Sequence, residues 1–124
     1  MLSDLQIQKI LRRAIGCRIL IVTASDSSAT EIKRDIIDYL NRRGNAGCMA
    51  FYSEHNEIKF RGAYQDIKIY PQYMWEHKPP MFPFDGEVYT TNHKIKVDNV
   101  RNAPRNFMEL IGGNNDVGTN MQQT

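Results

Sequence analysis

Residues 18–24, RILIVTA, form a nearly continuous run of β-branched and aliphatic side chains. A run of this kind, without polar alternation, predicts a strand that is covered on both faces. Helix-capping residues follow at Asp26-Ser27-Ser28, and apolar side chains then recur at helical spacing over residues 29–43, where Gly44 ends the pattern. A buried strand that leads into a capped helix indicates an α/β layer arrangement.

Further elements are predicted on both sides of this unit. An amphipathic helix spans residues 2–15, with Ser3 and Gln6 as a capping box. Downstream the pattern predicts strands over 48–52 and 57–60 about a turn at His55-Asn56, a hairpin of strands 66–70 and 73–78, a second hairpin over 88–97 and a closing helix over 104–111. The expected fold is a single α/β domain whose central sheet is mixed and largely antiparallel, flanked by at least two helices.

The composition is that of an ordinary globular chain. Its 124 residues are 41% hydrophobic and 24% charged, with a net charge of +2. These values exclude a fibrous or disordered chain, and any contact with nucleic acid would have to be local. We expect residues 1–111 to form one domain and residues 112–124 to form a flexible polar tail. Because no apolar run reaches membrane-spanning length and no signal peptide is recognisable, a cytoplasmic location is expected.

Charged residues stand out in the hairpin predicted over residues 66–78. With a turn at Pro71-Gln72, Asp66 would pair with Glu76, and Asp66, Glu76 and Lys78 would share one face of the hairpin. Cleavage of a phosphodiester with the help of Mg²⁺ needs hard oxygen ligands for the metal and a cation near the reacting phosphate. The hairpin therefore predicts a metal site formed by Asp66 and Glu76.

Three elements between residues 28 and 80 also follow the order of a known motif. They are the helix SSATEIKRDIIDYLNRRG with Glu31, a glycine step from Gly62 to Asp66, and Trp75-Glu76-His77-Lys78-Pro79. In this order they resemble the PD-(D/E)xK nuclease superfamily, within it the Holliday-junction-resolvase-like and virus-type replication-repair nucleases. The resemblance implies a Mg²⁺-dependent endonuclease that acts on branched or duplex DNA. Asp66 and Glu76 would then bind the metal, Lys78 would position the attacking water, and Glu31 would be an auxiliary ligand or base.

The remaining charged residues are consistent either with contacts to DNA in a nuclease or with ordinary solvent-exposed charges. If the chain cuts DNA, the nearest candidates for phosphate contacts are Arg34, Arg42, Arg43 and Lys59. A homodimer would suit a junction or duplex substrate because its two-fold symmetry matches that of the DNA. Glu31, however, stands three residues after Ser28 and closes a capping box, and Glu57-Ile58-Lys59 repeats the E-x-K pattern as an exposed ion pair.

A second hypothesis is a small non-enzymatic interaction protein, such as a phage accessory or inhibitor protein. Aromatic residues concentrate between residues 64 and 84, which suits a protein interface or a platform for base stacking. Three prolines between residues 79 and 83 predict an extended connector. The candidate partner-binding residues are Trp75, Phe82 and Phe84, and the partner is a protein or a nucleic acid. The hydrophobic core has an equal claim on these rings.

Overall fold

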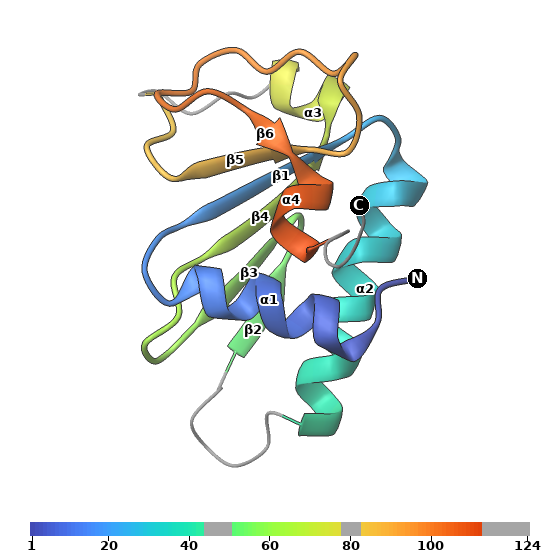
Figure 1. Ribbon diagram of the computed structural model, residues 1–124, viewed down its shortest axis with the longest axis vertical. Helices are drawn as coiled ribbons and strands as arrows, with labels where there is room; N and C mark the ends of the chain where they lie inside the picture. Colours follow the sequence, from blue (N-terminus) through green and yellow to red (C-terminus); the bar gives the residue numbers. More distant parts are fainter. Residues whose placement is uncertain (44–50, 78–82, 113–124) are drawn as a thin grey trace, which may run out of the picture.

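The computed structural model of the protein describes residues 1–43, 51–77 and 83–112 (Figure 1). Within these ranges the strands are β1 (Ile19–Thr23), β2 (Phe51–Glu54), β3 (Glu57–Phe60), β4 (Ile67–Pro71), β5 (Glu87–Thr90) and β6 (Arg105–Asn106). The helices are α1 (Asp4–Ala14), α2 (Asp26–Arg43), α3 (Gln72–His77) and α4 (Phe107–Ile111). The strands form one sheet in the order β2-β3-β4-β1-β5-β6, so the chain is a single α/β domain.

The strands at the centre of this sheet are parallel. β1 pairs in parallel with β4 on one side and with β5 on the other, and β5 pairs in parallel with β6. The pairs β2–β3 and β3–β4 are antiparallel. The prediction of a mixed sheet is confirmed, but the prediction that it is largely antiparallel is wrong, because hydrophobic runs report burial and not direction. Between β1 and β4 the chain crosses back through α2 and the β2–β3 hairpin, and a crossover of this kind makes neighbouring strands parallel.

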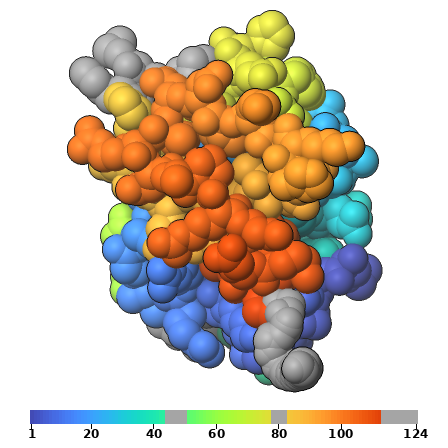
Figure 2. Space-filling model, turned by 45° about the horizontal axis from the view of Figure 1, so that its top comes forward, coloured from blue at the N-terminus to red at the C-terminus, as the bar shows by residue number. Residues whose placement is uncertain are grey.

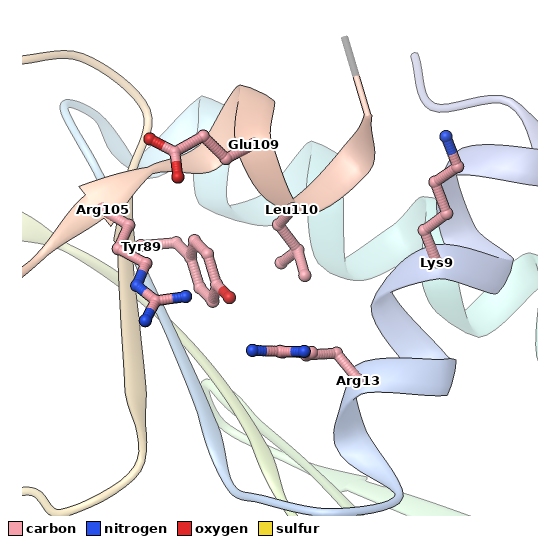
Figure 3. Close-up of a pocket in the computed structure, with 6 residues that line it drawn as sticks. All are labelled: Lys9, Arg13, Tyr89, Arg105, Glu109 and Leu110. Carbon is pink, nitrogen blue, oxygen red and sulfur yellow. The ribbon is translucent and has the colours of Figure 1, made fainter. Parts of the chain in front are cut away.

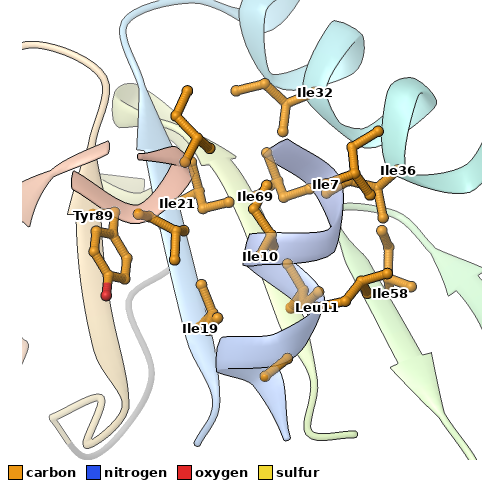
Figure 4. Close-up of a cluster of buried hydrophobic side chains, with 14 of the residues drawn as sticks. Ile7, Ile10, Leu11, Ile19, Ile21, Ile32, Ile36, Ile58, Ile69 and Tyr89 are labelled. Atoms are coloured by element: carbon orange, nitrogen blue, oxygen red, sulfur yellow. The ribbon is translucent and has the colours of Figure 1, made fainter. Parts of the chain in front are cut away.

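Three helices, α1, α2 and α4, cover one face of the sheet (Figure 1). Their apolar side chains form one buried cluster with those of β1 and β4, and Figure 4 shows among its members Ile7, Ile10, Ile21, Ile36 and Ile69. The capping box predicted at Ser3 and Gln6 is present, and all of β1 is buried, as its apolar run predicts. Among the described residues, no helix is long and apolar enough to cross a membrane.

The opposite face of the sheet has a smaller core under α3. Trp75 of α3 and Phe84 meet edge to face, with ring centroids 6.3 Å apart, and pack with Leu20 and Val22 of β1. In Figure 2 the segment that joins β5 to β6, in orange, lies between α3 in yellow-green and α4 in orange-red. Trp75 and Phe84 are each 3% exposed, so both rings are part of the core and offer no exposed aromatic patch; that they bind a partner stays a prediction. Phe82 lies outside the described residues.

The hairpin predicted over residues 66–78 is half right. Its first strand is β4, but the residues expected to form its second strand are helical and constitute α3. Two properties favour the helix: Gln72 and Glu76 interact one turn apart, and the turn places Trp75 against the second core. A six-residue helix has little stability of its own, so burial of Trp75 decides the conformation.

The last third of the chain also departs from the predicted hairpin. The first strand of that hairpin is β5, but residues 91–97 form turns and irregular chain rather than a second strand. The Asn92 side chain accepts a hydrogen bond from the Lys94 amide at 2.7 Å, and Ile95 then enters the second core. On the side away from β1, β5 pairs with β6, and the closing helix begins later than predicted, after Asn106 as its N-cap.

A hydrogen-bonded ion pair ties α1 to the sheet. Nε and Nη2 of Arg13 donate to the two carboxylate oxygens of Glu87 at 2.7 and 2.6 Å, and the hydroxyl of Tyr89 donates to Glu87 at 2.6 Å. These donors, Arg13 first, lower the pKa of Glu87 from 4.5 to about 2. Burial, together with Glu87, raises the pKa of Tyr89 to about 12. The end of α1 is thus fixed over the start of β5.

We expect Glu87→Gln to flatten the acid limb of the stability curve. Because the pKa of Glu87 is lowered from 4.5 to about 2 in the folded protein, its stabilisation is complete above pH 4.5 and is lost as the pH falls through that interval. The Arg13–Glu87 pair is partly solvated. On acidification through this interval, we expect the free energy of unfolding of the wild type to fall by about 1 to 2 kcal/mol more than that of the variant. Urea unfolding across this pH range measures the difference.

The control for this experiment is Glu109→Gln. Glu109 is an exposed carboxylate of α4 that forms no ion pair with the described residues. Its replacement should leave the acid limb as steep as in the wild type. Parallel curves for the wild type and Glu87→Gln would contradict the prediction.

Candidate ligand-binding site at the carboxyl ends of the parallel strands

The helices that follow β1 and β4 lie on opposite faces of the sheet. α2 follows β1 and packs on the face that carries Ile21, whereas α3 follows β4 and packs through Trp75 on the face that carries Val22. The carboxyl ends of β1 and β4 therefore form a topological switch point, which in open α/β sheets is where ligand crevices occur. The residues that follow these two strands are the first candidates for a site.

A hydrogen bond joins the two helices across the switch point. The hydroxyl of Tyr73, in the first turn of α3, lies 2.9 Å from Oδ1 and 2.8 Å from Oδ2 of Asp26, the first residue of α2. This hydrogen bond is the main cause of the raised pKa of Tyr73, since ionisation would remove the donor and place two negative charges together. Ser25 caps α2 by accepting the amide of Ser28 at 3.2 Å. Asp26 and Tyr73 are thus both held by well-formed local structure.

A pocket of about 360 Å³ opens beside Tyr73 at the carboxyl end of β4. Its walls come from the turn between β2 and β3, from the adjoining ends of β3 and β4, and from α3. The lining residues are His55, Asn56, Glu57, Tyr70, Tyr73, Met74 and His77. The Tyr73 and His77 rings lie edge to face, with centroids 6.5 Å apart. The pocket is mostly aromatic and lies near the lower end of the size range of small-molecule sites, which suits one compact ring system.

The turn that forms one wall of this pocket is anchored to both neighbouring elements. His55 has a φ of 54°, in the left-handed region that tight turns require. Its carbonyl oxygen accepts a hydrogen bond from Nζ of Lys33 in α2, and the carbonyl of Asn56 accepts the amide of Ile69 in β4 at 2.7 Å. The turn is therefore a fixed wall of the pocket.

Glu57 is the charged group of the pocket. Its Oε2 lies 3.0 Å from Nζ of Lys68 and accepts the hydroxyl of Tyr70 at 3.3 Å, while Oε1 lies 3.8 Å from Nζ of Lys59. Burial first, and then Glu57, raises the pKa of Tyr70, so this hydroxyl remains a donor. The two ammonium groups balance the Glu57 carboxylate, and the more loosely held Oε1 can accept hydrogen bonds from a ligand.

The structure separates the residues of the predicted metal site. Asp66 lies just before β4 and Glu76 lies in α3 beyond the other end, so the five-residue strand, roughly 15 Å long, stands between them. The predicted pairing of these two carboxylates is wrong, because α3 replaces the second strand of the hairpin. Glu31 is exposed on α2, 3.1 Å from the amino group of Met1, and Lys78 lies outside the described residues. The described part of the chain holds no group of three or more His, Cys, Asp or Glu side chains able to bind a metal ion.

The predicted phosphate-contacting residues lie on two elements, α2 and β3. Arg42 and Arg43 both approach Asp4, at 3.0 and 3.6 Å, so part of their charge is already neutralised. Arg34 is exposed elsewhere on α2. Lys59 lies on β3, 3.9 and 3.8 Å from two carboxylates of the β2–β3 hairpin. Through Glu57, Lys59 lies next to the pocket.

Several residues in or beside the pocket escaped the sequence analysis. Asp26 follows a buried strand, which is a signal for a site in a parallel α/β sheet, but helix capping explains the same residue. Glu57 was interpreted only as half of a surface ion pair. Nothing in the sequence indicates that the His55 turn and the His77 helix end face one another, because their proximity depends on the pairing of β3 with β4.

Comparison of the chain with protein-family models, with curated proteins and with solved structures finds no match. The class that the structure defines is a single α/β domain with a mixed six-stranded sheet and a pocket beside its switch point.

Proposed function

We propose that the protein binds a small nitrogen heterocycle of the nucleobase type in the pocket between the β2–β3 turn and α3. The observation that carries the proposal is that this pocket lies at the carboxyl end of β4 and adjoins the switch point between β1 and β4 through Tyr73, which is bonded to Asp26. Pocket and switch point are independent features, since one follows from side-chain shapes and the other from chain connectivity. Their proximity favours a binding site over an accidental surface hollow.

The lining of the pocket supports a flat aromatic ligand. Tyr70, Tyr73 and His77 offer ring faces and edges, and Met74 offers a polarisable thioether. Planar heterocycles stack on such groups, and base–aromatic stacking contributes about 1 to 3 kcal/mol per base. The volume of about 360 Å³ suits a single base or nucleoside better than a dinucleotide.

Glu57 supports a preference for bases that present N–H donors. A carboxylate accepts hydrogen bonds and donates none, so it favours an edge with donors and disfavours an edge with carbonyl oxygens only. Guanine has two neighbouring donors, N1–H and the N2 amino group, on one edge and can engage one carboxylate with both. Uracil has a single ring N–H between two carbonyl groups. The expected order of affinity is therefore guanosine above inosine, and inosine above uridine.

Glu57→Gln is expected to weaken guanosine binding about tenfold or more, because glutamine keeps the shape but replaces one acceptor oxygen by a donor amide. Isothermal titration of guanosine, inosine and uridine into both proteins measures the change. A thermal unfolding curve of each protein shows whether the variant is folded, since Glu57 also pairs with Lys68.

Glu54→Gln is the matched control. Glu54 lies on the adjoining strand β2 and also approaches Lys59, at 3.9 Å, but it does not line the pocket. This variant removes the same charge from the same hairpin and should keep the affinity within about twofold. The proposal fails if the wild type takes up none of the three nucleosides, or if Glu54→Gln weakens binding as much as Glu57→Gln.

The two functions expected from the sequence stay predictions. Metal-dependent cleavage of DNA has lost its main geometric argument, since Asp66 and Glu76 lie at opposite ends of β4. A non-enzymatic binding role agrees with the present proposal. The two proposals differ in the residues that contact the partner. The sequence pointed to Trp75 and Phe84, which are buried, whereas the present proposal places the contact in the pocket at Glu57 and Tyr73.

A further inference from the structure

A second pocket, of about 300 Å³, lies on the other face of the sheet, between α1, α4 and the edge formed by β5 and β6 (Figure 3). Its lining residues are Lys9, Arg13, Tyr89, Arg105, Glu109 and Leu110. Lys9 and Arg13 stand one turn apart on α1, whereas Arg105 comes from β6 on the opposite side. In Figure 3 the guanidinium groups of Arg13 and Arg105 point toward one another, with the hydroxyl of Tyr89 close by. The fold thus brings cations from distant parts of the chain to one hollow.

The Arg13 side chain is held in place at this pocket by the Glu87 carboxylate. Its Nε and Nη2 are occupied by Glu87 at 2.7 and 2.6 Å, and Tyr89 donates to the same carboxylate. Interaction with Tyr89 adds to the raised pKa of Arg13, of which Glu87 is the main cause. An arginine held in this way loses little further conformational entropy when it binds a ligand, so the N–H groups that Glu87 and Tyr89 leave available are preorganised donors.

Lys9 and Arg105 form no direct ion pair within the described residues, although Arg105 is close enough to Glu87 to help lower the pKa of that carboxyl. Within residues 1–43, 51–77 and 83–112, neither side chain has a carboxylate oxygen within 4.0 Å. The carboxylates near the pocket are Glu87, which is paired with Arg13, and Glu109 of α4. Cations therefore outnumber carboxylates around the hollow. Like charges that face each other without a counter-ion repel, and a bound anion would remove this repulsion.

We propose that this pocket binds the phosphate group of a small phosphomonoester or free inorganic phosphate. The guanidinium groups of Arg13 and Arg105 supply donors from opposite sides, a geometry that suits a tetrahedral oxyanion, while the Lys9 ammonium lies farther off, beside Gly112 at the end of α4 (Figure 3). The pocket is larger than a bare phosphate requires, and Leu110 provides an apolar wall for an organic part. A polynucleotide backbone fits less well, because the donors lie in a hollow between two helices and a sheet edge, with the carboxylate of Glu109 beside it.

The test is to titrate the full chain separately with inorganic phosphate, ribose 5-phosphate and ribose at constant ionic strength. Calorimetry measures the affinity, and amide NMR shifts locate the binding site. We expect both phosphates to bind and ribose not to bind, with shifts centred on Tyr89, Arg105 and Leu110. Arg105→Gln should weaken phosphate binding about tenfold, because it removes a charged donor that has no ion pair within the described structure. Tighter binding of ribose 5-phosphate than of inorganic phosphate would assign the pocket to a phosphomonoester, and equal affinities would assign it to free phosphate.

Arg12→Gln is the matched control. Arg12 lies beside Arg13 on α1 and is exposed, but it does not line this pocket. Its loss changes the net charge as Arg105→Gln does and should alter phosphate affinity less than about twofold. Two results would overturn the proposal: no uptake of either phosphate by the wild type, or equal weakening by Arg12→Gln and Arg105→Gln, which would indicate general surface attraction.

Discussion

Ile21→Ala is expected to lower the free energy of unfolding by about 3 to 4 kcal/mol. Ile21 lies in the central strand β1, is 0% exposed and belongs to the cluster between the sheet and the helices α1 and α2 (Figure 4). Its replacement removes buried methyl and methylene groups and leaves a cavity that rigid neighbours on three elements can fill only in part. The loss is a large part of the total stability, since domains of this size are stable by about 5 to 15 kcal/mol. Urea unfolding followed by circular dichroism measures the change.

The control for this change is Leu5→Ala on α1. Leu5 is 59% exposed, so the same kind of truncation removes little buried surface and should change the stability by less than about 0.5 kcal/mol. If the Ile21 variant loses less than about 1 kcal/mol, then Ile21 does not fill the space between the sheet and the helices.

Gly86→Ala is expected to destabilise the protein by about 3 kcal/mol, at the upper end of what overpacking usually costs. Gly86 is buried just before β5, and a Cβ atom there would lie 2.8 Å from the carbonyl carbon of Arg18, even closer to its oxygen, and 2.8 Å from Cε2 of Phe84. The Arg18 carbonyl cannot simply move away, because it accepts the amide of Glu87 at 2.9 Å where β5 joins β1. The added methyl group must therefore push two strands apart or displace a core ring. Thermal and urea unfolding of the variant test this result.

Gly16→Ala is the matched control for Gly86→Ala. Gly16 lies just after α1, and a Cβ atom placed there would have no atom within 4 Å. Alanine at this position also restricts the unfolded chain, so the variant should be within about 1 kcal/mol of the wild type. Equal destabilisation by the two substitutions would show that the loss comes from backbone freedom and not from the close approach of β5 to β1.

The helices and strands that the sequence predicts correctly are those with strong local signals. The capping box at Ser3 and Gln6 forms because the interacting groups lie within one helical turn. β1 is buried throughout because a run of aliphatic residues is stable only when both of its faces are covered. The hairpin over residues 66–78 fails because period-2 alternation over a few residues also fits a strand followed by a short helix. Burial of Trp75 chooses between the two, and it depends on residues far away in the chain.

The candidate sites depend even more strongly on distant residues. Asp26 and Tyr73 are 47 positions apart and meet because β4 returns beside β1. Arg13 meets Glu87 across 74 positions because β5 lies on the other side of β1. The resemblance to a nuclease rested on the spacing of Asp66 and Glu76, which says nothing about the direction in which the chain runs between them.

The sequence by itself determined the layered α/β class, the central buried strand and the presence of the two long helices, because each follows from the chemistry of neighbouring residues. The predicted start of the second helix is wrong, since α2 begins at Asp26 and is capped by Ser25, so Ser28 and Glu31 form no capping box at its N-terminus. The tertiary structure alone decided the parallel order of the central strands, the helical state of residues 72–77 and the two pockets. The physical reason is that strand direction and side-chain convergence depend on contacts between residues distant in the chain, and such contacts leave no periodic pattern in a single sequence.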